Sequence, residues 1–456
     1  MSSATSAAGL LFMLAATGTT HGLQAGRLQG IWESEGYGRI YEVTAGTVNV
    51  FDVTRVSCVR HEVLSLATFL AGINRINLSN RDAFSYYLEG GITRYAYRRL
   101  AALPRRCVGA VDAAADRDPG RNFDVFWHSF DENYAFFAVR GVDWDALYGE
   151  YRPRVTPATS DDELFDIITE IVARIDDRHV LVERPGYPRR YSGHPGTLQT
   201  LLQKELPDGA AATRAQIRER AKTLIAGEYL GASRRQAGKG QFTWGWVAEG
   251  IGYFSIDSME GYTPADATLQ DSHRLVDRIM DRVIRDLHGA RGIVVDARWN
   301  GGGYDSNALH IAGHFTDRQL VAFTKRARNG DSFTPEQEIF IPWHARNRYA
   351  GPLVYLCGRD TLSAAEIFSM AMMAMPNATS LGEPTVGSLS DTHSIFLPNG
   401  WRLQLSNEEY RAIDGVVYEG AGIPVDVALP PADGATLDGY IRAVLDAAIA
   451  RLEAGD

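Results

Sequence analysis

Apolar and polar positions alternate in the first part of the chain. In residues 38–43 and 47–53 an apolar side chain stands at almost every second position, and glycines flank the run. This pattern is typical of antiparallel strands joined by turns. The alternation ends before a polar, turn-rich segment at residues 116–120. We therefore expect a small β domain over residues 27–115.

The next part of the chain has the periodicity of helices. From residue 122 to about residue 175, apolar side chains recur three and four positions apart, and Ser160 precedes three acidic residues as a helix start. Residues 182–240 are polar and also helical in pattern, most clearly at residues 197–230. These segments predict a helical domain over residues 116–240.

From Trp246 onward, strands and helices alternate. Residues 250–256, 292–296 and 353–357 predict strands, and residues 265–287 predict an amphipathic helix. Continuous apolar strands are typical of parallel sheets that are buried on both faces. The fold class is therefore α/β, with a βαβ catalytic core over residues 241–456 and an active site at the carboxyl ends of its strands.

Composition narrows the classes of function. The chain has 456 residues and a formal net charge of −10 at pH 7. Nucleic acid is not an expected partner, because phosphate binding needs a concentrated basic face. After the N-terminus, no stretch of the sequence is long and apolar enough to span a bilayer.

The N-terminus and the cysteines bear on localisation. Residues 1–26 contain an apolar run and small residues but no Lys or Arg, so they match only part of a secretory signal segment. Export and cytoplasmic residence both stay open. Three cysteines are too few for a disulfide framework, although an exported chain would allow a Cys58–Cys107 bridge. Cys357 lies in an apolar strand, where it is expected to be a small buried residue.

Two segments carry candidate chemistry. Ser363 follows a predicted buried strand and a short polar turn, and it stands at the start of a helix with small residues. Unpaired amides and the helix dipole favour negative charge at such a position. Residues 296–303 form the second segment, in which three glycines after a buried strand let backbone amides approach a ligand. Their spacing fits neither a phosphate-binding loop nor a dinucleotide loop.

Together with two later motifs, these segments resemble the C-terminal-processing (tail-specific) protease family, which includes the tricorn core protease. The four motifs occur in the family's order at residues 296–303, 361–366, 382–387 and 419–426. The likeness extends over roughly residues 122–450. It implies an α/β fold with a ClpP/crotonase-like βαβ core. It also implies that Ser363 is the nucleophile and that the amides of Gly302 and Ala364 form the oxyanion hole.

The resemblance also bears on the general base. One branch of the family uses a Lys after the third motif, and here that position is Ser388. The tricorn-like branch uses a His early in the catalytic region, where His179 stands. A carboxylate must orient the imidazole, and Glu419 is the expected one. Because Arg178 replaces the Ser that precedes the family's His, Asp176 or Asp177 is an alternative to Glu419.

The expected function is peptide-bond hydrolysis through an acyl-enzyme, acting on a peptide or protein without a metal or cofactor. Residues 182–240 lack the glycine-rich loop of the PDZ domain that many relatives carry, so a PDZ domain is not expected. Two alternatives stay open: a non-catalytic, ligand-binding relative of the family, and an esterase or amidase acting on a small metabolite. The sequence does not indicate the oligomeric state.

Overall fold

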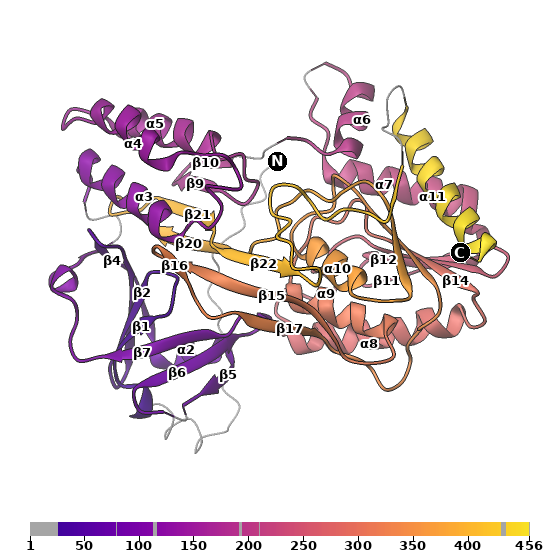
Figure 1. Ribbon diagram of the computed structural model, residues 1–456, viewed down its shortest axis with the longest axis horizontal. Coiled ribbons are helices and arrows are strands. Elements are labelled where there is room, and N and C mark those ends of the chain that lie inside the picture. The colour runs from indigo at the N-terminus through magenta and orange to yellow at the C-terminus, as the bar shows by residue number, and fades with distance from the viewer. Residues whose placement is uncertain are drawn as a thin grey trace.

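The computed structural model describes residues 26–78, 80–112, 116–190, 194–208, 210–429 and 435–455. The candidate signal segment therefore lies outside the described residues, apart from Gly26. Figure 1 shows an N-terminal sheet with three helices above it on the left and an α/β part on the right. A long, narrow sheet runs between the two. Among the described residues, no helix combines the length and apolar character needed to cross a membrane.

The N-terminal part is one eight-stranded sheet, antiparallel except where β8 joins β4. The strands predicted at residues 38–43 and 47–53 are confirmed, and stacked aromatic rings such as those of Phe84 and Tyr97 fill its core. A disulfide joins Cys58 to Cys107, as the sequence allowed for an exported chain. In spatial order the strands are β5 (Ile73–Asn77), β6 (Ala83–Leu88), β7 (Tyr95–Leu100), β1 (Gly30–Ser34), β2 (Arg39–Val43), β3 (Thr47–Val53), β4 (Cys58–Ser65) and β8 (Val111–Asp112). Along the chain, helix α2 (Leu66–Ala71) connects β4 to β5.

Three helices follow, as the periodicity predicted: α3 (Pro119–Asn133), α4 (Trp144–Tyr151) and α5 (Asp161–Ala173). Each begins at a side-chain cap, from Asp118, Asp143 and Ser160 respectively, and the Ser160 cap is a complete capping box. Their apolar faces form one core with a small four-stranded sheet. The order of that sheet is β10 (Tyr187–Arg190), β9 (Leu181–Arg184), β21 (Arg402–Ser406) and β20 (Thr392–Phe396).

This small sheet corrects the expectation that residues 182–240 are helical throughout. Strands β9 and β10 cover most of residues 181–190, and β11 lies at Arg235–Ala237. β9 pairs with β21 from the C-terminal third of the chain, so its hydrogen-bonding partner lies more than 200 residues away. A four-residue strand has too few positions for the period of two to be distinguished from other patterns. The predicted helices at residues 197–230 are present as α6 (Thr197–Glu205) and α7 (Arg214–Ile225).

The α/β part is built on a seven-stranded sheet whose last five strands are parallel. Three of them, β13, β14 and β18, are the buried strands expected from the sequence. The proposed active-site motifs follow the carboxyl ends of β14 and β18, where the sequence placed them. The spatial order is β11, β12 (Phe242–Ala248), β13 (Ile251–Ile256), β14 (Gly292–Asp296), β18 (Leu353–Cys357), β19 (Ala378–Gly382) and β23 (Val427–Ala428).

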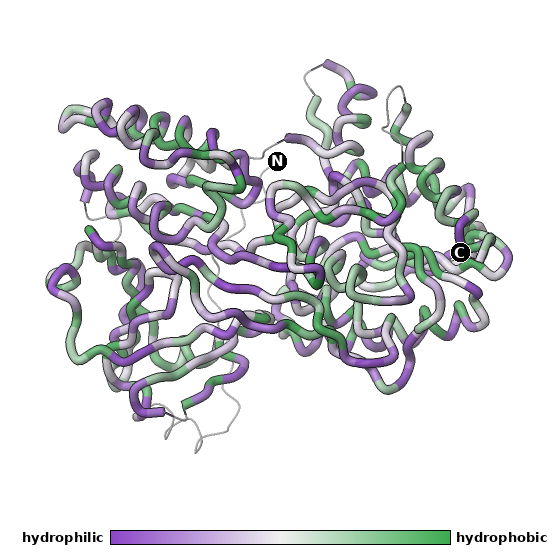
Figure 2. Tube along the Cα trace, in the orientation of Figure 1, coloured by the Kyte–Doolittle hydropathy of each residue, from purple (hydrophilic) through white to green (hydrophobic). Residues whose placement is uncertain are grey.

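Helices cover both faces of this sheet, which explains why its strands are apolar throughout. One face packs on α8 (Leu269–Asp286), α9 (Asp305–Ala312) and α10 (Ala364–Met373). The other face packs on α6, α7 and α11 (Leu437–Ala454). In β14, for example, Val295 points into the first core and Val294 into the second. Figure 2 shows hydrophobic stretches gathered between these helices.

The long sheet connects the two parts of the molecule (Figure 1). Within it, Lys325 forms a buried ion pair with Glu408 at 2.6 Å, and the hydroxyl of Tyr37 from the N-terminal part donates to the same carboxylate at 2.5 Å. A polar network therefore holds the N-terminal sheet against the rest of the chain. The strands are β15 (Leu320–Asn329), β16 (Ser332–Phe333), β17 (Gln337–Ile341) and β22 (Glu408–Ala412), and β15 lies between β17 and β22.

Candidate active site

Ser363 occupies a tight turn between β18 and α10. Its backbone angles are φ 58° and ψ −128°, a combination that is costly for a residue with a side chain. An ordinary helix N-cap is extended and uses its side chain to accept from the helix. Here the carbonyl oxygen of Ser363 accepts the Glu366 amide at 2.6 Å. The turn therefore combines a capping box with Glu366 and the strained strand-turn-helix form of a nucleophile elbow.

Glu366 holds this turn in place. Its side chain is fully buried and accepts four hydrogen bonds. Burial raises its pKa, whereas the four hydrogen bonds lower it, and burial is the larger effect. The donors are the amide of Ser363 at 3.1 Å, the hydroxyl of Thr385 at 2.7 Å and the amides of Gly387 and Ser388 at 2.7 and 3.0 Å. The Ser363 turn is therefore fixed to residues 385–388. An acid among the small residues of a helix start is the sequence signal for this role.

The glycine loop lies against the same turn. Gly302 has a φ of +97°, and a Cβ placed on it would stand 2.7 Å from the Cβ of Ser363 and 2.9 Å from the amide nitrogen of Ala364. The amide of Leu362 donates to the carbonyl of Asn300 at 3.1 Å, which joins the two loops. The structure thus brings Gly302, Ser363 and Ala364 together. The Gly302 amide itself donates to Asn300 Oδ1 at 2.8 Å.

Two other polar residues of the glycine motif hold the end of β14, which precedes the loop. Asp296 and Arg298 form a buried ion pair at 2.7 Å, and the hydroxyl of Tyr253 donates to Asp296 at 3.0 Å. Arg298 also donates to the carbonyl of Ile441 on α11. These contacts fix the end of β14, which indicates a structural role for Asp296 and Arg298.

His179 stands in a loop between α5 and β9. Its amide donates to Asp177 Oδ1 at 2.8 Å, and its carbonyl accepts from Gln404 Nε2 at 3.0 Å. Asp177 is fully buried, and its second oxygen accepts the hydroxyl of Tyr134 at 2.9 Å. The backbone of His179 is therefore held on one side by the end of α3 and on the other by β21.

Arg140 joins this loop to the Ser363 turn. Its guanidinium donates to the carbonyl of Asp176 at 2.6 Å and to the carbonyl of Gly387 at 3.2 Å. The residue after Gly387 is Ser388, whose carbonyl accepts the amide of Ser363 at 3.2 Å. One side chain thus connects the segment that carries His179 with the segment that supports Ser363. No pattern in the sequence signals this role, since Arg140 lies in an irregular stretch after α3.

Glu419 lies beside the same arginine. Its Oε1 accepts from Arg140 at 3.3 Å, and its Oε2 accepts the amides of Leu389 and Ser390 at 2.9 and 3.1 Å. Burial, followed by the charge of Asp177, raises the pKa of Glu419 well above its usual range. The role of Glu419 toward His179 stays a prediction, because its described contacts go to Arg140 and to the backbone.

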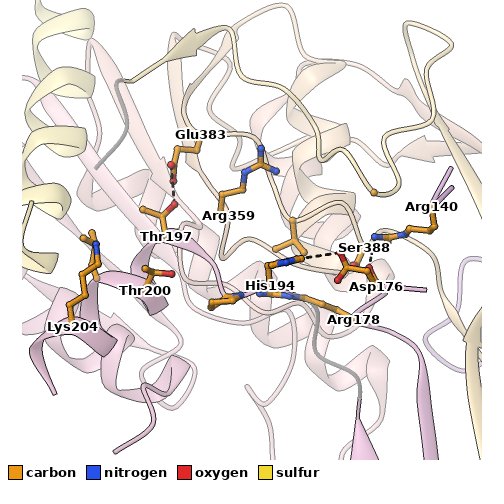
Figure 3. Close-up of a pocket in the computed structure, with 14 residues that line it drawn as sticks. Arg140, Asp176, Arg178, His194, Thr197, Thr200, Lys204, Arg359, Glu383 and Ser388 are labelled. Atoms are coloured by element: carbon orange, nitrogen blue, oxygen red, sulfur yellow. Dashed lines mark hydrogen bonds and ion pairs between the residues drawn. The ribbon is translucent and has the colours of Figure 1, made fainter. Parts of the chain in front are cut away.

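A cavity of about 480 Å³ opens beside these residues. Figure 3 shows Arg140, Asp176 and Ser388 gathered at one side and Lys204 and Thr200 at the other. Asp176 pairs with His194 at 3.2 Å, and Thr197 donates to Glu383 at 3.0 Å. Cationic side chains outnumber acidic ones in its lining, which includes Arg140, Arg178, Lys204 and Arg359 against Asp176 and Glu383.

Comparison with known proteins identifies related sequences and structures. Residues 250–429 match the model of peptidase family S41, and residues 116–173 match the tricorn protease C1 domain. The chain is 28% identical to a chloroplastic C-terminal processing peptidase of Tetradesmus obliquus over 144 residues, 31% of this chain and 30% of that protein. It is 26% identical to the carboxy-terminal processing protease CtpA of Bacillus subtilis (strain 168) over 149 residues, 33% of this chain and 31% of that protein. The chain thus matches about a third of the length of these relatives.

Solved structures share the fold. The crystal structure of a candidate peptidase from Parabacteroides merdae ATCC 43184 superposes with a TM-score of 0.58 at 24% identity, covering 74% of this chain and 97% of that one. Mature CPAF gives a TM-score of 0.50 at 12% identity, covering 74% of this chain and 98% of that one. These likenesses show a mixed α/β fold. The family models and the curated relatives that the chain matches are those of peptidase family S41, the tricorn protease and C-terminal processing proteases, which its motifs also resemble.

Proposed function

We propose that this protein is a serine peptidase that hydrolyses peptide bonds through an acyl-enzyme. The observation that carries the proposal is the strained turn at Ser363, held against a glycine loop at the carboxyl ends of two parallel strands. In this mechanism the Ser363 hydroxyl attacks the scissile carbonyl, and His179 takes its proton. His179 then protonates the leaving amine, and water releases the acyl group by the same steps.

The oxyanion is stabilised by backbone amides. Ala364 is the first residue of α10, so its amide is one of the donors without a partner inside the helix. The second donor is Gly302, which must exchange its hydrogen bond to Asn300 for one to the substrate. Donors of this kind contribute about 3 kcal/mol each to transition-state stabilisation in other serine hydrolases.

The assignment of His179 as base is supported by the contacts of Arg140, which joins the His179 loop to the backbone beside Ser363. The carboxylate that orients the imidazole is Glu419 or Asp177. The contacts favour Asp177, because it already holds the amide of His179 at 2.8 Å. Glu419 then acts as the buried counter-charge of Arg140.

The substrate is a peptide or protein segment that enters the cavity beside Ser388. The cationic lining of that cavity suits a segment that carries a carboxylate. We also propose that the catalytic core is of the ClpP/crotonase-like type. The predicted domains were residues 27–115, 116–240 and 241–456, but α6 and α7 pack with the sheet of the last of these. Substrate selection takes place without a PDZ domain, since α6 and α7 occupy most of residues 197–225.

A fluorophosphonate probe, which labels activated serines, tests the nucleophile. Ser363→Ala should abolish labelling and leave the circular dichroism spectrum unchanged. Ser388→Ala is the matched control: it removes a neighbouring hydroxyl in the cavity and should still be labelled. Labelling of Ser363→Ala at the wild-type level would refute the assignment.

The base is tested in the same assay. His179→Ala should slow labelling by about a hundredfold or more, the usual contribution of a general base. His194→Ala, an exposed histidine of the same cavity, should label at the wild-type rate. Equal rates for the two variants would remove His179 from the mechanism. Retention of apolar ligands without turnover of casein would favour the ligand-binding alternative, and turnover of esters alone would favour an esterase.

A further inference from the structure

A second cluster of chemically capable side chains lies on the face of the sheet that carries α8 and α9. Asp277 comes from α8, His310 from α9, His314 from the turn that ends α9, and His344 from the loop after β17. One carboxylate oxygen and one nitrogen from each imidazole all lie within 4.8 Å of one another. None of these residues belongs to the proposed catalytic machinery.

We propose that Asp277, His310, His314 and His344 bind one Zn²⁺ ion. Three imidazoles and one carboxylate are a donor set that zinc accepts with four ligands. His310 and His314 are four residues apart, the spacing that puts two imidazoles on one face of a helix. Zinc bonds of 2.0–2.1 Å place tetrahedral ligand atoms roughly 3.3 Å from one another. His314 Nε2 lies 3.3 Å from Asp277 Oδ1, whereas His310 Nε2 shares a 2.8 Å hydrogen bond with the same oxygen, which bonds to the ion would replace.

The orientation of the His314 ring is a second argument for a cation. Its Nδ1 lies 3.0 Å from the carbonyl oxygen of Asn347, and a carbonyl only accepts, so Nδ1 carries the proton. This leaves Nε2 on the side of the ring that faces Asp277. This Nε2 is buried and lies 3.3 Å from Oδ1 of Asp277. A metal ion could bind to both atoms.

The surroundings of the cluster resemble those of a metal site. A ligating imidazole commonly donates its other N–H to a carbonyl, as His314 does to Asn347. His344 is held similarly, since its Nε2 lies 3.2 Å from the carbonyl of His310, and its ring stacks on that of His314 at 3.8 Å. The side chain of His314 is only 2% exposed, whereas that of Asp277 is 44% exposed. The ion would therefore bind at a buried site that it can reach from solvent on the side of Asp277.

The proposed ion has a structural role. Helix α9 begins two residues after Gly303 and ends at the cluster, so an ion bound there would join α8, α9 and the loop after β17. It would support the glycine loop from the far end of α9 without taking part in the reaction at Ser363. Zinc binding and hydrolysis are thus independent proposals.

The test uses the full chain, stripped with a chelator and then mixed with Zn²⁺. After dialysis, elemental analysis should find about one zinc per chain, and the melting temperature should rise relative to the stripped protein. Co²⁺ in place of Zn²⁺ should give the visible absorption of a tetrahedral site. Ser363→Ala should bind zinc as the wild type does.

Variants identify the ligands. Asp277→Asn and His344→Ala should each weaken zinc binding by roughly a hundredfold or more, since even second-shell changes cost 10- to 100-fold. His273→Gln is the matched control: this ring stacks on His310 at 4.2 Å but is not one of the four proposed ligands, so zinc binding should persist. Asp277 is partly exposed, so its variant should fold, and circular dichroism checks this. Stripped wild type that takes up no zinc, or ligand variants that bind it undiminished, would overturn the proposal.

Discussion

Gly302 has no room for a side chain. A Cβ at this position would stand within 2.9 Å of Ser363, Leu362 and Ala364, and its φ of +97° is strained for any other residue. We therefore expect Gly302→Ala to displace the loop from the Ser363 turn and to lower kcat by about a hundredfold, as loss of one oxyanion donor does. Steady-state peptide hydrolysis measures this change.

The matched control is Gly227→Ala, at a position where an added Cβ meets nothing within 4 Å. That variant should keep wild-type kcat and thermal stability. If Gly302→Ala also kept wild-type kcat, the glycine loop would have no part in stabilising the oxyanion.

Asp305 makes stability depend on pH. Burial, and next the charge of Asp391, raises its pKa to about 8. An unfolded Asp ionises near pH 4. Between these values the folded state holds a proton that the unfolded state has released, so stability is full below about pH 4 and falls as pH rises toward 8. Asp305→Asn removes this contribution, so its unfolding free energy in urea should fall less between pH 5 and pH 8 than that of the wild type. Parallel curves for the two proteins would contradict the shifted pKa.

At the scale of single residues, the sequence predicted those site residues that lie close together in the chain. Ser363 and Ala364 are adjacent, and the glycines follow a recognisable strand, so their motifs could be identified. The role of Arg140 was missed, because its acceptors on Gly387 and Glu419 lie more than 200 residues away in the chain. Such contacts leave no periodic pattern, and one sequence gives no means of pairing distant positions.

At the scale of elements, the Cys58–Cys107 bridge joins β4 to the turn before β8. It closes a loop with a sequence separation of 49, and the chain-entropy relation gives a stabilisation of about 4 kcal/mol for such a loop. We expect the double variant Cys58→Ala/Cys107→Ala to lose about this much unfolding free energy in the transition of the N-terminal sheet, followed in urea. A reductant should destabilise the wild type and leave the double variant unchanged. A reductant effect on the double variant would point to another cause.

Elements with a clear local pattern could be predicted, and elements without one could not. Helix α8 has 18 residues with a clear apolar stripe, and β14 is a continuous buried run, so each carries its own signal. β9 and β10 have four residues each and exist because β21 supplies a hydrogen-bonding partner. Their conformation is set by tertiary pairing, which outweighs the weak local preference.

At the scale of the whole molecule, the proposed site lies where two parts meet. Ser363 and the glycine loop belong to the α/β part, whereas His179 and Arg140 belong to the helical part. The division at residue 240 is crossed by β21, which pairs with β9. The catalytic geometry therefore depends on how firmly these parts are joined.

Arg140 is the side chain that joins them at the site, so its removal tests this dependence. Arg140→Gln would leave the buried carboxylates of Asp177 and Glu419 without their cation, and breaking a buried pair in this way costs about 3–5 kcal/mol. We expect a matching loss of unfolding free energy in urea. Labelling of Ser363 by the fluorophosphonate probe should also slow, because the His179 loop loses its hydrogen bond at Asp176.

Two further variants separate charge from geometry. Arg140→Lys keeps the positive charge but cannot reach three acceptors with a fixed planar group, so it should recover most of the stability and little of the labelling rate. Arg359→Gln is the control, since this arginine lines the same cavity and donates to the carbonyls of Thr385 and Ala421 without contacting the His179 loop in the described structure. It should label nearly as the wild type does. If Arg140→Gln labelled as fast as Arg359→Gln, the joint between the two parts would have no bearing on catalysis, and the base would have to be sought within the α/β part itself.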